Sequence, residues 1–456
     1  MKHLTKLSAL AVALCLVSVP ASAQSLADTF AAAYRSSDLL EQNRALLRAA
    51  DEDVAIAVAR LRPVVNFVTG AQTSIRSGGQ QSTSMNLGLN AEITLIDFGR
   101  GKLAREGAKA QVLALRQALV NFEQTVLLDA VSAFMDVRSA SEAVSLSQAT
   151  QRVITQELNA ARERFELGEI TRTDVSLAEA RLAAARSQLA AAEGDLAAAR
   201  EFYKLVTGAY PGQLRPPPAL PRTASNLQTA QDIARRTHPL IAQRQNEVTA
   251  AELGAESVLA ERSGAVTGSA SVGRQFGGAT GEGSSATAAI NYRRPIFQGG
   301  QSGAQYRKAT AQRDATRARL HQTVAQVLQN VAVAWANVDV ATARIAASQQ
   351  QVRASQSAFE GTREEARLGA RTTLDVLNAE TDLLDARTTL LQAQAAQQIA
   401  TYNLLAAMGL LTVDHLGLGI PTYDAEAYYN AVRNAPRNSS VQGDQLDRVL
   451  RSIGRQ

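Results

Sequence analysis

The sequence predicts a mostly α-helical fold with a β section, in which one unit, helix–β-hairpin–long helix–turn–helix, occurs twice. Two observations lead to this fold class. First, features of the helical segments recur at a constant offset of 201 residues, which indicates an internal duplication. Second, two pairs of segments change from the helical period to an alternation of apolar and polar residues, the pattern of β-strands. A chain of 456 residues is long enough for two such units.

A secretory signal peptide is predicted for residues 1–23. Its start is basic, residues 7–19 form an apolar run too short to span a bilayer, and residues 21–23 (A-S-A) match a signal peptidase cleavage site. The single cysteine, Cys15, lies inside this segment. The exported chain is therefore expected to have no disulfide and no thiol chemistry.

The first repeat is expected at residues 24–207. From Met85 to Leu95 an apolar side chain occupies every second position, which predicts a strand with one apolar and one polar face. The expected elements are a first helix, strands at about 64–76 and 84–96, a long helix from Arg100 to about Arg164, a tip turn at about 164–175 and a returning helix.

The second repeat is expected at residues 226–409, after a connector at 208–225 that is rich in proline and glycine. Its elements are a first helix, strands at about 265–276 and 285–296, a long helix from Gln301 to about Arg367, a tip turn at about 365–376 and a returning helix. Residues 410–456 are predicted to be a C-terminal connector and, from about Asn434, a disordered tail, because that part is polar and charged.

Each tip turn is marked by a glycine, a threonine and an aspartate. These are Gly168, Thr171 and Asp174, and 201 residues later Gly369, Thr372 and Asp375. The glycines suit helix C-caps. The aspartates suit either helix capping or a functional carboxylate, and the residues alone leave both open. Each long helix of about 65 residues would measure roughly 95–100 Å.

Composition excludes several function classes. The formal net charge of +5 falls to +3 without the two lysines of the predicted signal peptide (5 − 2 = 3), and basic residues form no stripe interleaved with aromatics. Nucleic acid is therefore not an expected partner. The exported chain has three scattered histidines, His238, His321 and His415, and lacks the H-E-x-x-H and G-x-S-x-G motifs. No enzyme activity, cofactor or metal is expected.

The strands suit a transmembrane β section, although soluble sheets alternate in the same way. Four strands cannot close on themselves, and an open sheet edge cannot lie in lipid. If the strands cross a membrane, several chains must share one barrel.

The order of the elements, the I-F-x-G-G turn at residues 296–300 and the two tip sequences resemble the TolC family of outer-membrane efflux and type I secretion channel proteins. The first tip carries Arg164-Phe165, Leu167-Gly168 and Ile170 to Val175, and the second carries Leu368-Gly369, Arg371-Thr372 and Asp375-Val376-Leu377. The resemblance covers nearly all of the chain after the signal peptide.

The resemblance implies a homotrimer, in which a 12-stranded barrel in the outer membrane continues into a periplasmic α-helical tunnel. Such a channel-tunnel is the exit duct of tripartite drug efflux pumps, of type I protein secretion, or of both. The implied partners are outer-membrane lipid, a periplasmic adaptor (membrane fusion) protein and an inner-membrane RND-type or ABC transporter. The implied location is the outer membrane of a Gram-negative bacterium, with an extension into the periplasm.

The resemblance also implies site residues. Asp375 would stand in an acidic ring at the closed periplasmic entrance, and Arg371 would be a latch with Thr173 and Asp174 as its partners on the other turn. A second acidic position of the family falls on Asn378. The tips that meet the adaptor would comprise Leu167, Gly168, Glu169, Leu368, Gly369 and Ala370.

Two alternatives to a channel are a periplasmic adaptor and a coiled-coil scaffold. An adaptor would have one helical hairpin flanked by β-rich domains rather than a full duplication. A scaffold would not need the alternating strands or their repetition.

Overall fold

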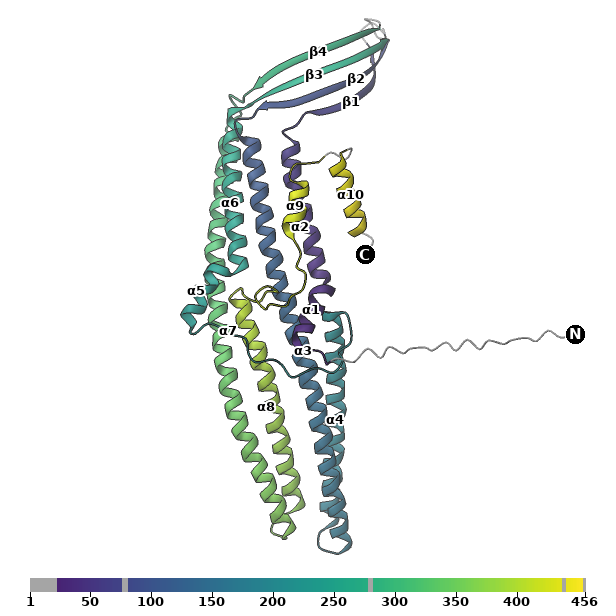
Figure 1. Cartoon of the computed structure of the whole chain (residues 1–456), viewed down its shortest axis with the longest axis vertical. Helices are drawn as coiled ribbons and strands as arrows, with labels where there is room; N and C mark the ends of the chain where they lie inside the picture. The colour runs from purple at the N-terminus through teal and green to yellow at the C-terminus, as the bar shows by residue number, and fades with distance from the viewer. Residues whose placement is uncertain (1–22, 76–80, 278–281, 437–439, 454–456) are drawn as a thin grey trace, which may run out of the picture. The chain divides into compact units, whose positions relative to one another are not determined.

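The structure is a computed structural model that describes residues 23–75, 81–277, 282–436 and 440–453 (Figure 1). The predicted signal peptide, apart from its last residue, therefore lies outside the described residues. The chain folds into two compact units. Unit 1 comprises Met1–Arg35, Ala130–Leu220 and Val352–Gln392, and unit 2 comprises Ser36–Asp129, Pro221–Gln351 and Ala393–Gln456.

The order of the elements confirms the predicted fold class, a mostly helical chain with a small antiparallel sheet. The helices are α1 (Leu26–Ser36), α2 (Asp38–Ala59), α3 (Arg100–Glu166), α4 (Arg172–Thr207), α5 (Leu227–Thr237), α6 (Pro239–Ala260), the short 3-10 helix η1 (Glu261–Ser263), α7 (Gln301–Arg367), α8 (Thr373–Ala407), α9 (Ala425–Val432) and α10 (Val441–Ile453). The strands are β1 (Val64–Ile75), β2 (Gln81–Ile96), β3 (Ala265–Gly277) and β4 (Gly283–Arg293). Among the described residues, no helix combines the length and the apolar character needed to cross a membrane.

The first helix expected in each repeat is in fact two helices, and the break occurs at equivalent positions. Ser37 separates α1 from α2, and His238, 201 residues later, separates α5 from α6. The Ser37 hydroxyl accepts the backbone N–H of Leu40 at 3.3 Å, and Nδ1 of His238 accepts that of Leu240 at 3.2 Å. Burial lowers the pKa of His238 to about 4, so the imidazole stays neutral and can accept this bond. Both side chains act as N-caps that start a new helix.

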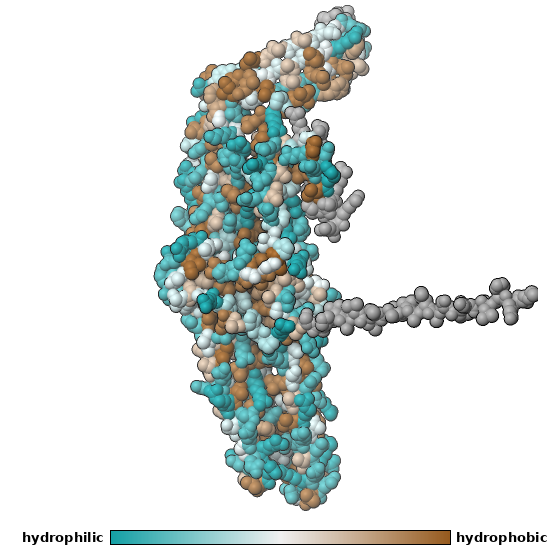
Figure 2. All heavy atoms as spheres, in the orientation of Figure 1, coloured by the Kyte–Doolittle hydropathy of each residue, from teal (hydrophilic) through white to brown (hydrophobic). Residues whose placement is uncertain are grey.

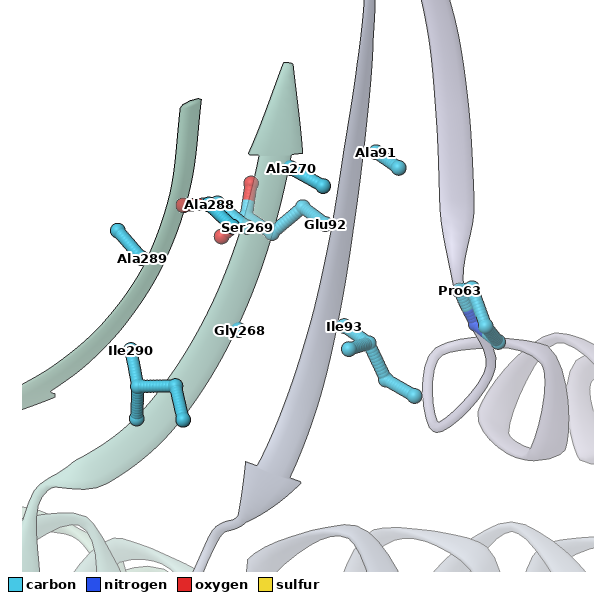
Figure 3. A pocket seen from close by; sticks show the side chains of 10 residues that line it. All are labelled: Pro63, Ala91, Glu92, Ile93, Gly268, Ser269, Ala270, Ala288, Ala289 and Ile290. Carbon is cyan, nitrogen blue, oxygen red and sulfur yellow. The ribbon is translucent and has the colours of Figure 1, made fainter. Parts of the chain in front are cut away.

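The sheet has the order β1-β2-β3-β4, and all its pairs are antiparallel. Because β2 pairs with β3, the hairpins of the two repeats form one sheet. Space-filling atoms show hydrophobic residues gathered over these strands (Figure 2). A shallow pocket of about 550 Å³ lies on the sheet, where Gly268 separates Ile93 from Ile290 (Figure 3).

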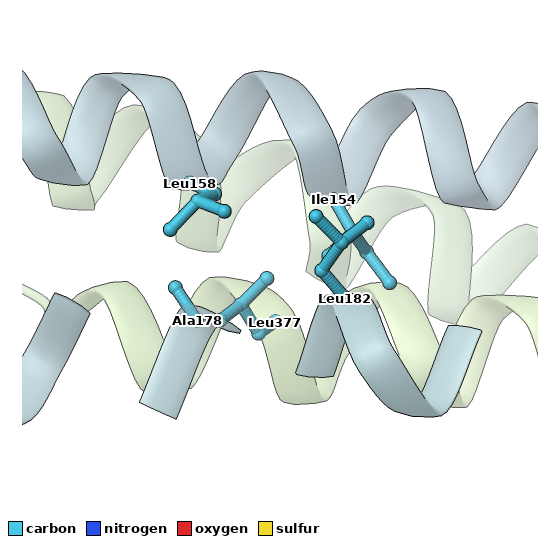
Figure 4. Close-up of a cluster of buried hydrophobic side chains, with 5 residues drawn as sticks. All are labelled: Ile154, Leu158, Ala178, Leu182 and Leu377. Atoms are coloured by element: carbon cyan, nitrogen blue, oxygen red, sulfur yellow. The ribbon is translucent and has the colours of Figure 1, made fainter. Parts of the chain in front are cut away.

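The core of unit 1 joins the two helix pairs. Leu377 of α8 packs with Ile154 and Leu158 of α3 and with Ala178 and Leu182 of α4 (Figure 4). A second cluster consists of Phe359 and Ala366 of α7 and Val376 and Leu383 of α8, against which Val153 of α3 packs. Helix α3 therefore contributes to both clusters and fixes the two tip turns in one unit.

The core of unit 2 contains a buried carboxyl group. Leu47 and Val54 of α2 pack with Val112 of α3, and Tyr423 and Tyr429 pack against this cluster. On the same helix α2, Asp51 has none of its surface exposed, and neither of its carboxylate oxygens has a hydrogen-bond partner.

The structure corrects the expectation of a disordered tail for Val441–Ile453, which forms α10. The Ser440 hydroxyl accepts the backbone N–H of Gly443 at 3.0 Å and starts the helix. Leu446 and Val449, three residues apart, lie on one helical face. Composition alone suggested disorder because it ignores both the cap and this spacing.

Candidate functional site

The first tip turn, between α3 and α4, ends α3 with a left-handed glycine. Gly168 has φ 78°, a conformation that costs a residue with a side chain more than it costs glycine. Its N–H donates to the carbonyl of Phe165 at 2.9 Å, and the N–H of Glu169 donates to that of Arg164 at 2.9 Å. These two bonds form the Schellman motif that satisfies the last carbonyls of a helix.

The second tip turn, between α7 and α8, has the same geometry. Gly369 has φ 79°, its N–H donates to Ala366 at 3.2 Å, and the N–H of Ala370 donates to Glu365 at 2.9 Å. Each glycine is thus a C-cap in the single chain.

Each returning helix then begins with a capping box. The Asp174 carboxylate accepts the backbone N–H of Thr171 at 3.0 Å and its hydroxyl at 2.8 Å, while the N–H of Asp174 donates to the Thr171 hydroxyl at 3.3 Å. The Asp375 carboxylate accepts the corresponding bonds from Thr372 at 3.0 and 2.8 Å. These bonds hold the pKa of the Asp375 carboxyl below its usual value, with the backbone bond as the largest cause, so the carboxylate is charged at neutral pH.

The two turns line one shallow cavity of about 380 Å³. Thr171 and Asp174 line it from the first turn, and Gly369, Arg371 and Thr372 line it from the second. The structure therefore brings Asp174 and Arg371, which the sequence predicts to act together, to the same cavity.

The ionic partner of Arg371 in this chain lies on its own turn. Its Nε donates to the Glu365 carboxylate at 2.9 Å. The Asp174 carboxylate is engaged by the capping box, and Thr173 is exposed on the first turn of α4. The predicted pairing of Arg371 with Thr173 and Asp174 thus stays a prediction for the assembled state.

Asn378, the remaining residue predicted for the gate, lies one turn beyond Asp375 on α8 and is exposed. Its side-chain oxygen accepts a hydrogen bond from Arg181 of α4 at 2.7 Å. No sequence signal marks Arg181, because only the packing of α4 beside α8 brings it to Asn378.

The outermost side chains of both turns are apolar and exposed. Leu167 has 75% of its surface exposed and Leu368 has 79%. Gly168, Glu169, Gly369 and Ala370, the other residues predicted to meet an adaptor, are exposed as well. Two exposed leucines at matched positions are a suitable surface for apolar contact with a partner protein.

Above the turns, equivalent charged residues of the two repeats have different partners. Arg162 of α3 pairs with Glu179 of α4 at 2.6 Å. At the positions 201 residues later, Arg363 of α7 pairs instead with Glu157 of α3 at 3.1 Å. Glu380 of α8 is buried.

Glu380 also has a partner on α3. Its carboxylate is hydrogen-bonded to Thr150, and burial raises the pKa of the carboxyl group. Arg363 and Glu380 are the residues equivalent to the Arg162–Glu179 ion pair, so the offset of 201 residues would predict an ion pair between them. No sequence signal indicates that each of them instead has a partner on α3. Among the described residues, no group of three or more His, Cys, Asp or Glu side chains could hold a metal ion.

The model of a family described as outer membrane efflux protein matches residues 31–208 and 231–410, one match over each predicted repeat. The outer membrane efflux protein BepC of Brucella suis biovar 1 (strain 1330) is 31% identical to the chain over 417 residues, 91% of each protein.

Solved outer-membrane channels share the fold. The Campylobacter jejuni CmeC outer membrane channel matches with a TM-score of 0.76 and 14% identity, over 90% of this chain and 89% of that one. The Vibrio cholerae outer membrane protein VceC matches with a TM-score of 0.71 and 20% identity, over 84% and 96%. The Neisseria gonorrhoeae MtrE outer membrane channel, solved in an open state, matches with a TM-score of 0.73 and 22% identity, over 84% and 88%.

Proposed function

Because the chain belongs to the outer membrane efflux protein family, we propose that three copies form the exit duct of a tripartite efflux assembly, closed at its periplasmic end by the paired tip turns. Members of this family are channel-forming outer-membrane proteins that extend into the periplasm, so the chain is not an enzyme. The family also excludes the alternatives of a periplasmic adaptor and a coiled-coil scaffold.

The sheet supports the proposed trimer. In one chain β1 and β4 are edge strands with unpaired backbone groups. Pairing β4 of each copy with β1 of the next satisfies these groups, and three copies give a closed sheet of 12 strands. Closure is required if the strands lie in lipid, because hydrocarbon offers no hydrogen bonds to an open edge.

The observation that carries the proposed gate is the matched geometry of the two tip turns. Each has a left-handed glycine and a capping box, and both line one cavity. Each chain therefore supplies two equivalent helix ends, so three chains supply six.

The charged residues of the turns would hold these ends together. Asp375 of three copies would form an acidic ring that attracts cations, and the three carboxyl groups would oppose one another's ionisation. Arg371, with its directed guanidinium donors, would act as the latch between Glu365 of its own turn and Asp174 across the cavity. Thr173 and Asn378 would border the same entrance.

The exposed tip leucines support the proposed adaptor contact. The family works in assemblies with a periplasmic adaptor and an inner-membrane pump. We propose that the adaptor binds the surface formed by Leu167, Leu368 and their exposed neighbours. The inner-membrane pump would be an RND-type or ABC transporter. The tunnel would carry drugs, secreted proteins or both, according to that transporter.

The experiment that tests the gate is single-channel conductance of the purified trimer in planar bilayers. Wild type should give a small, cation-preferring conductance, and Arg371→Ser should give a clearly larger one. Arg367→Ser is the matched control, because Arg367 is also an exposed arginine of this tip and pairs with Glu364 at 3.2 Å. It should leave the conductance unchanged.

The outcomes separate the parts of the proposal. Equal, large conductances in wild type and Arg371→Ser would keep the channel and remove Arg371 from its gate. A larger conductance in both arginine variants would show that the overall charge of the tip, rather than Arg371 in particular, keeps the channel closed. Trimeric protein without any conductance would contradict the channel itself.

A further inference from the structure

The first residue after the predicted signal peptide is tied to the connector that follows the first repeat. Gln24 forms an isolated parallel bridge with Leu214. Its backbone N–H donates to the carbonyl of Gln213 at 2.8 Å, and its backbone carbonyl accepts the N–H of Arg215 at 2.9 Å. All of these residues belong to unit 1. The beginning of the first repeat is therefore attached to the segment directly behind its end.

The side chain of Gln24 bonds to the same connector. Its Oε1 accepts the backbone N–H of Gly212 at 3.1 Å and, more weakly, the hydroxyl of Tyr203 at 3.4 Å. The hydroxyls of Tyr203 and Thr29 are hydrogen-bonded at 3.0 Å, and both residues are buried. We call Tyr203 and residues 212–215 the N-terminal socket. The backbone nitrogen and the side-chain carbonyl of Gln24 thus bond to two adjacent residues of this socket, Gln213 and Gly212.

Glutamine has a reaction of its own when it is the first residue of a chain. Its unprotonated α-amine can attack the side-chain carbonyl carbon, Cδ, and close a five-membered lactam. The bond between Cδ and the side-chain amide nitrogen breaks, and that nitrogen leaves as ammonia with the proton given up by the α-amine. The step needs no oxidant, reductant or cofactor. The product, pyroglutamate, keeps one N–H and one carbonyl oxygen, and the charge of the terminus is lost, as in other N-terminal modifications.

The N-terminal socket suits the lactam better than an open terminus. An open terminus at Gln24 would be an ammonium group with three N–H donors and a full charge. Among the described residues, the structure gives the nitrogen of Gln24 one acceptor, the carbonyl of Gln213. The Asp28 carboxylate accepts the N–H and the hydroxyl of Ser25, at 2.9 and 2.7 Å, rather than the N–H of Gln24. The ring holds its N–H and its carbonyl on one edge, so both can face the connector, where Gln213 accepts and Gly212 donates.

We infer that the chain is cleaved after Ala23 and that Gln24 then closes to pyroglutamate, which docks into the N-terminal socket. The inference rests on the predicted signal peptide and is independent of the proposed channel. Closure takes place while the new terminus is free, and folding then fixes the product. The docked lactam ties α1 to α4 through Tyr203 and Thr29, and it removes the free amine on which aminopeptidases act.

The test is mass spectrometry of the N-terminal peptide, after free amines of the intact protein purified from cells have been dimethylated. Dimethylation marks an open terminus and prevents its later closure, whereas a lactam stays unmarked. Trypsin then releases residues 24–35, because Arg35 is the first cleavage site after Gln24. We expect an unmarked peptide that is lighter than the open peptide by one molecule of ammonia.

The chain supplies a matched control for closure during sample handling. The tryptic peptide that begins at Gln117, directly after Arg116, also starts with glutamine. Its amine becomes free only during digestion, so its closed fraction measures closure in the test tube. The variant Gln24→Asn cannot form the five-membered ring and should give a marked, open terminus.

The outcomes separate cleavage from closure. A marked, open Gln24 in the wild type would refute the lactam and keep the cleavage site. A terminus at any other residue would refute both. Conductance tests the channel separately, so failure here leaves the proposed function standing.

Hydrogen–deuterium exchange tests whether the lactam occupies the N-terminal socket. Gln24→Asn keeps the backbone carbonyl that bonds to Arg215 but loses the lactam carbonyl that accepts the N–H of Gly212. Loss of one hydrogen bond should speed exchange in residues 209–215 by about fivefold. Gln213→Asn is the matched control, because Gln213 bonds to Gln24 through its backbone carbonyl, and it should leave this exchange unchanged. Wild-type exchange in Gln24→Asn would refute docking of the lactam.

Discussion

Replacing the buried carboxylate of Asp51 by an amide should stabilise unit 2 at neutral pH. Burial, which outweighs the attraction of Arg116, raises the pKa of the Asp51 carboxyl from 3.8 to about 6. Each pKa unit corresponds to about 1.4 kcal/mol, so the ionised carboxylate costs the folded state at most about 3 kcal/mol. Because an asparagine amide also stays buried without a partner, we expect Asp51→Asn to gain roughly 1–3 kcal/mol.

The sign of the pH dependence follows from the raised pKa. Between 3.8 and about 6 the folded state binds more protons than the unfolded state, so stability falls as pH rises through this window and is constant above it. The gain in Asp51→Asn should therefore be complete above about pH 7 and mostly absent near pH 4.

Hydrogen–deuterium exchange of the purified protein, followed by mass spectrometry on peptides of α2 and α9, measures this local stability. A gain of this size slows exchange by roughly 10- to 100-fold relative to wild type at the same neutral pH. The exposed Asp53 on the same helix gives the matched control, Asp53→Asn, which should change little. Faster exchange in Asp51→Asn at neutral pH would show that Arg116 compensates the buried charge and would refute the reasoning.

Three further predictions concern unit 1. Gly369→Ala should destabilise the second tip turn by about 1–2 kcal/mol, because alanine is strained at φ 79°; unchanged amide exchange in residues 365–376 would contradict this. Thr171→Ala should weaken the start of α4 by about 1 kcal/mol through loss of the capping box, whereas Thr171→Ser should not, as amide exchange there can report. Glu380→Gln should raise the thermal midpoint at neutral pH, because burial raises the pKa of this carboxyl and the charged form is disfavoured; an equal gain well below that pKa would point to packing instead.

The duplication made most of the fold predictable from the sequence. The long helices were expected from Arg100 to about Arg164 and from Gln301 to about Arg367, and the structure has Arg100–Glu166 and Gln301–Arg367. These limits are visible because proline is missing inside the helices and because a glycine lies two residues beyond each end, at Gly168 and Gly369. The division of the first helix at Ser37 has no strong sequence signal, because a single capping side chain causes it.

The candidate site was predictable only in its local part. The glycine and aspartate of each turn have strong backbone preferences, and they cap the helices through residues close to them in the sequence. Their capping role can therefore be predicted from the sequence. The bonds of Arg181 to Asn378 and of Glu380 to Thr150 depend on how helices are rotated about their axes. A single sequence carries no record of that rotation.

Equivalent charged residues of the two repeats have different partners, and this difference limits how far one repeat could replace the other. Arg363 and Glu380 occupy the positions of the second repeat that are equivalent to Arg162 and Glu179. Arg363 nevertheless pairs with Glu157 of the first repeat, whereas Arg162 pairs with Glu179. A chain assembled from two copies of either half would therefore lack one member of the Arg363–Glu157 pair, so the two repeats are no longer interchangeable.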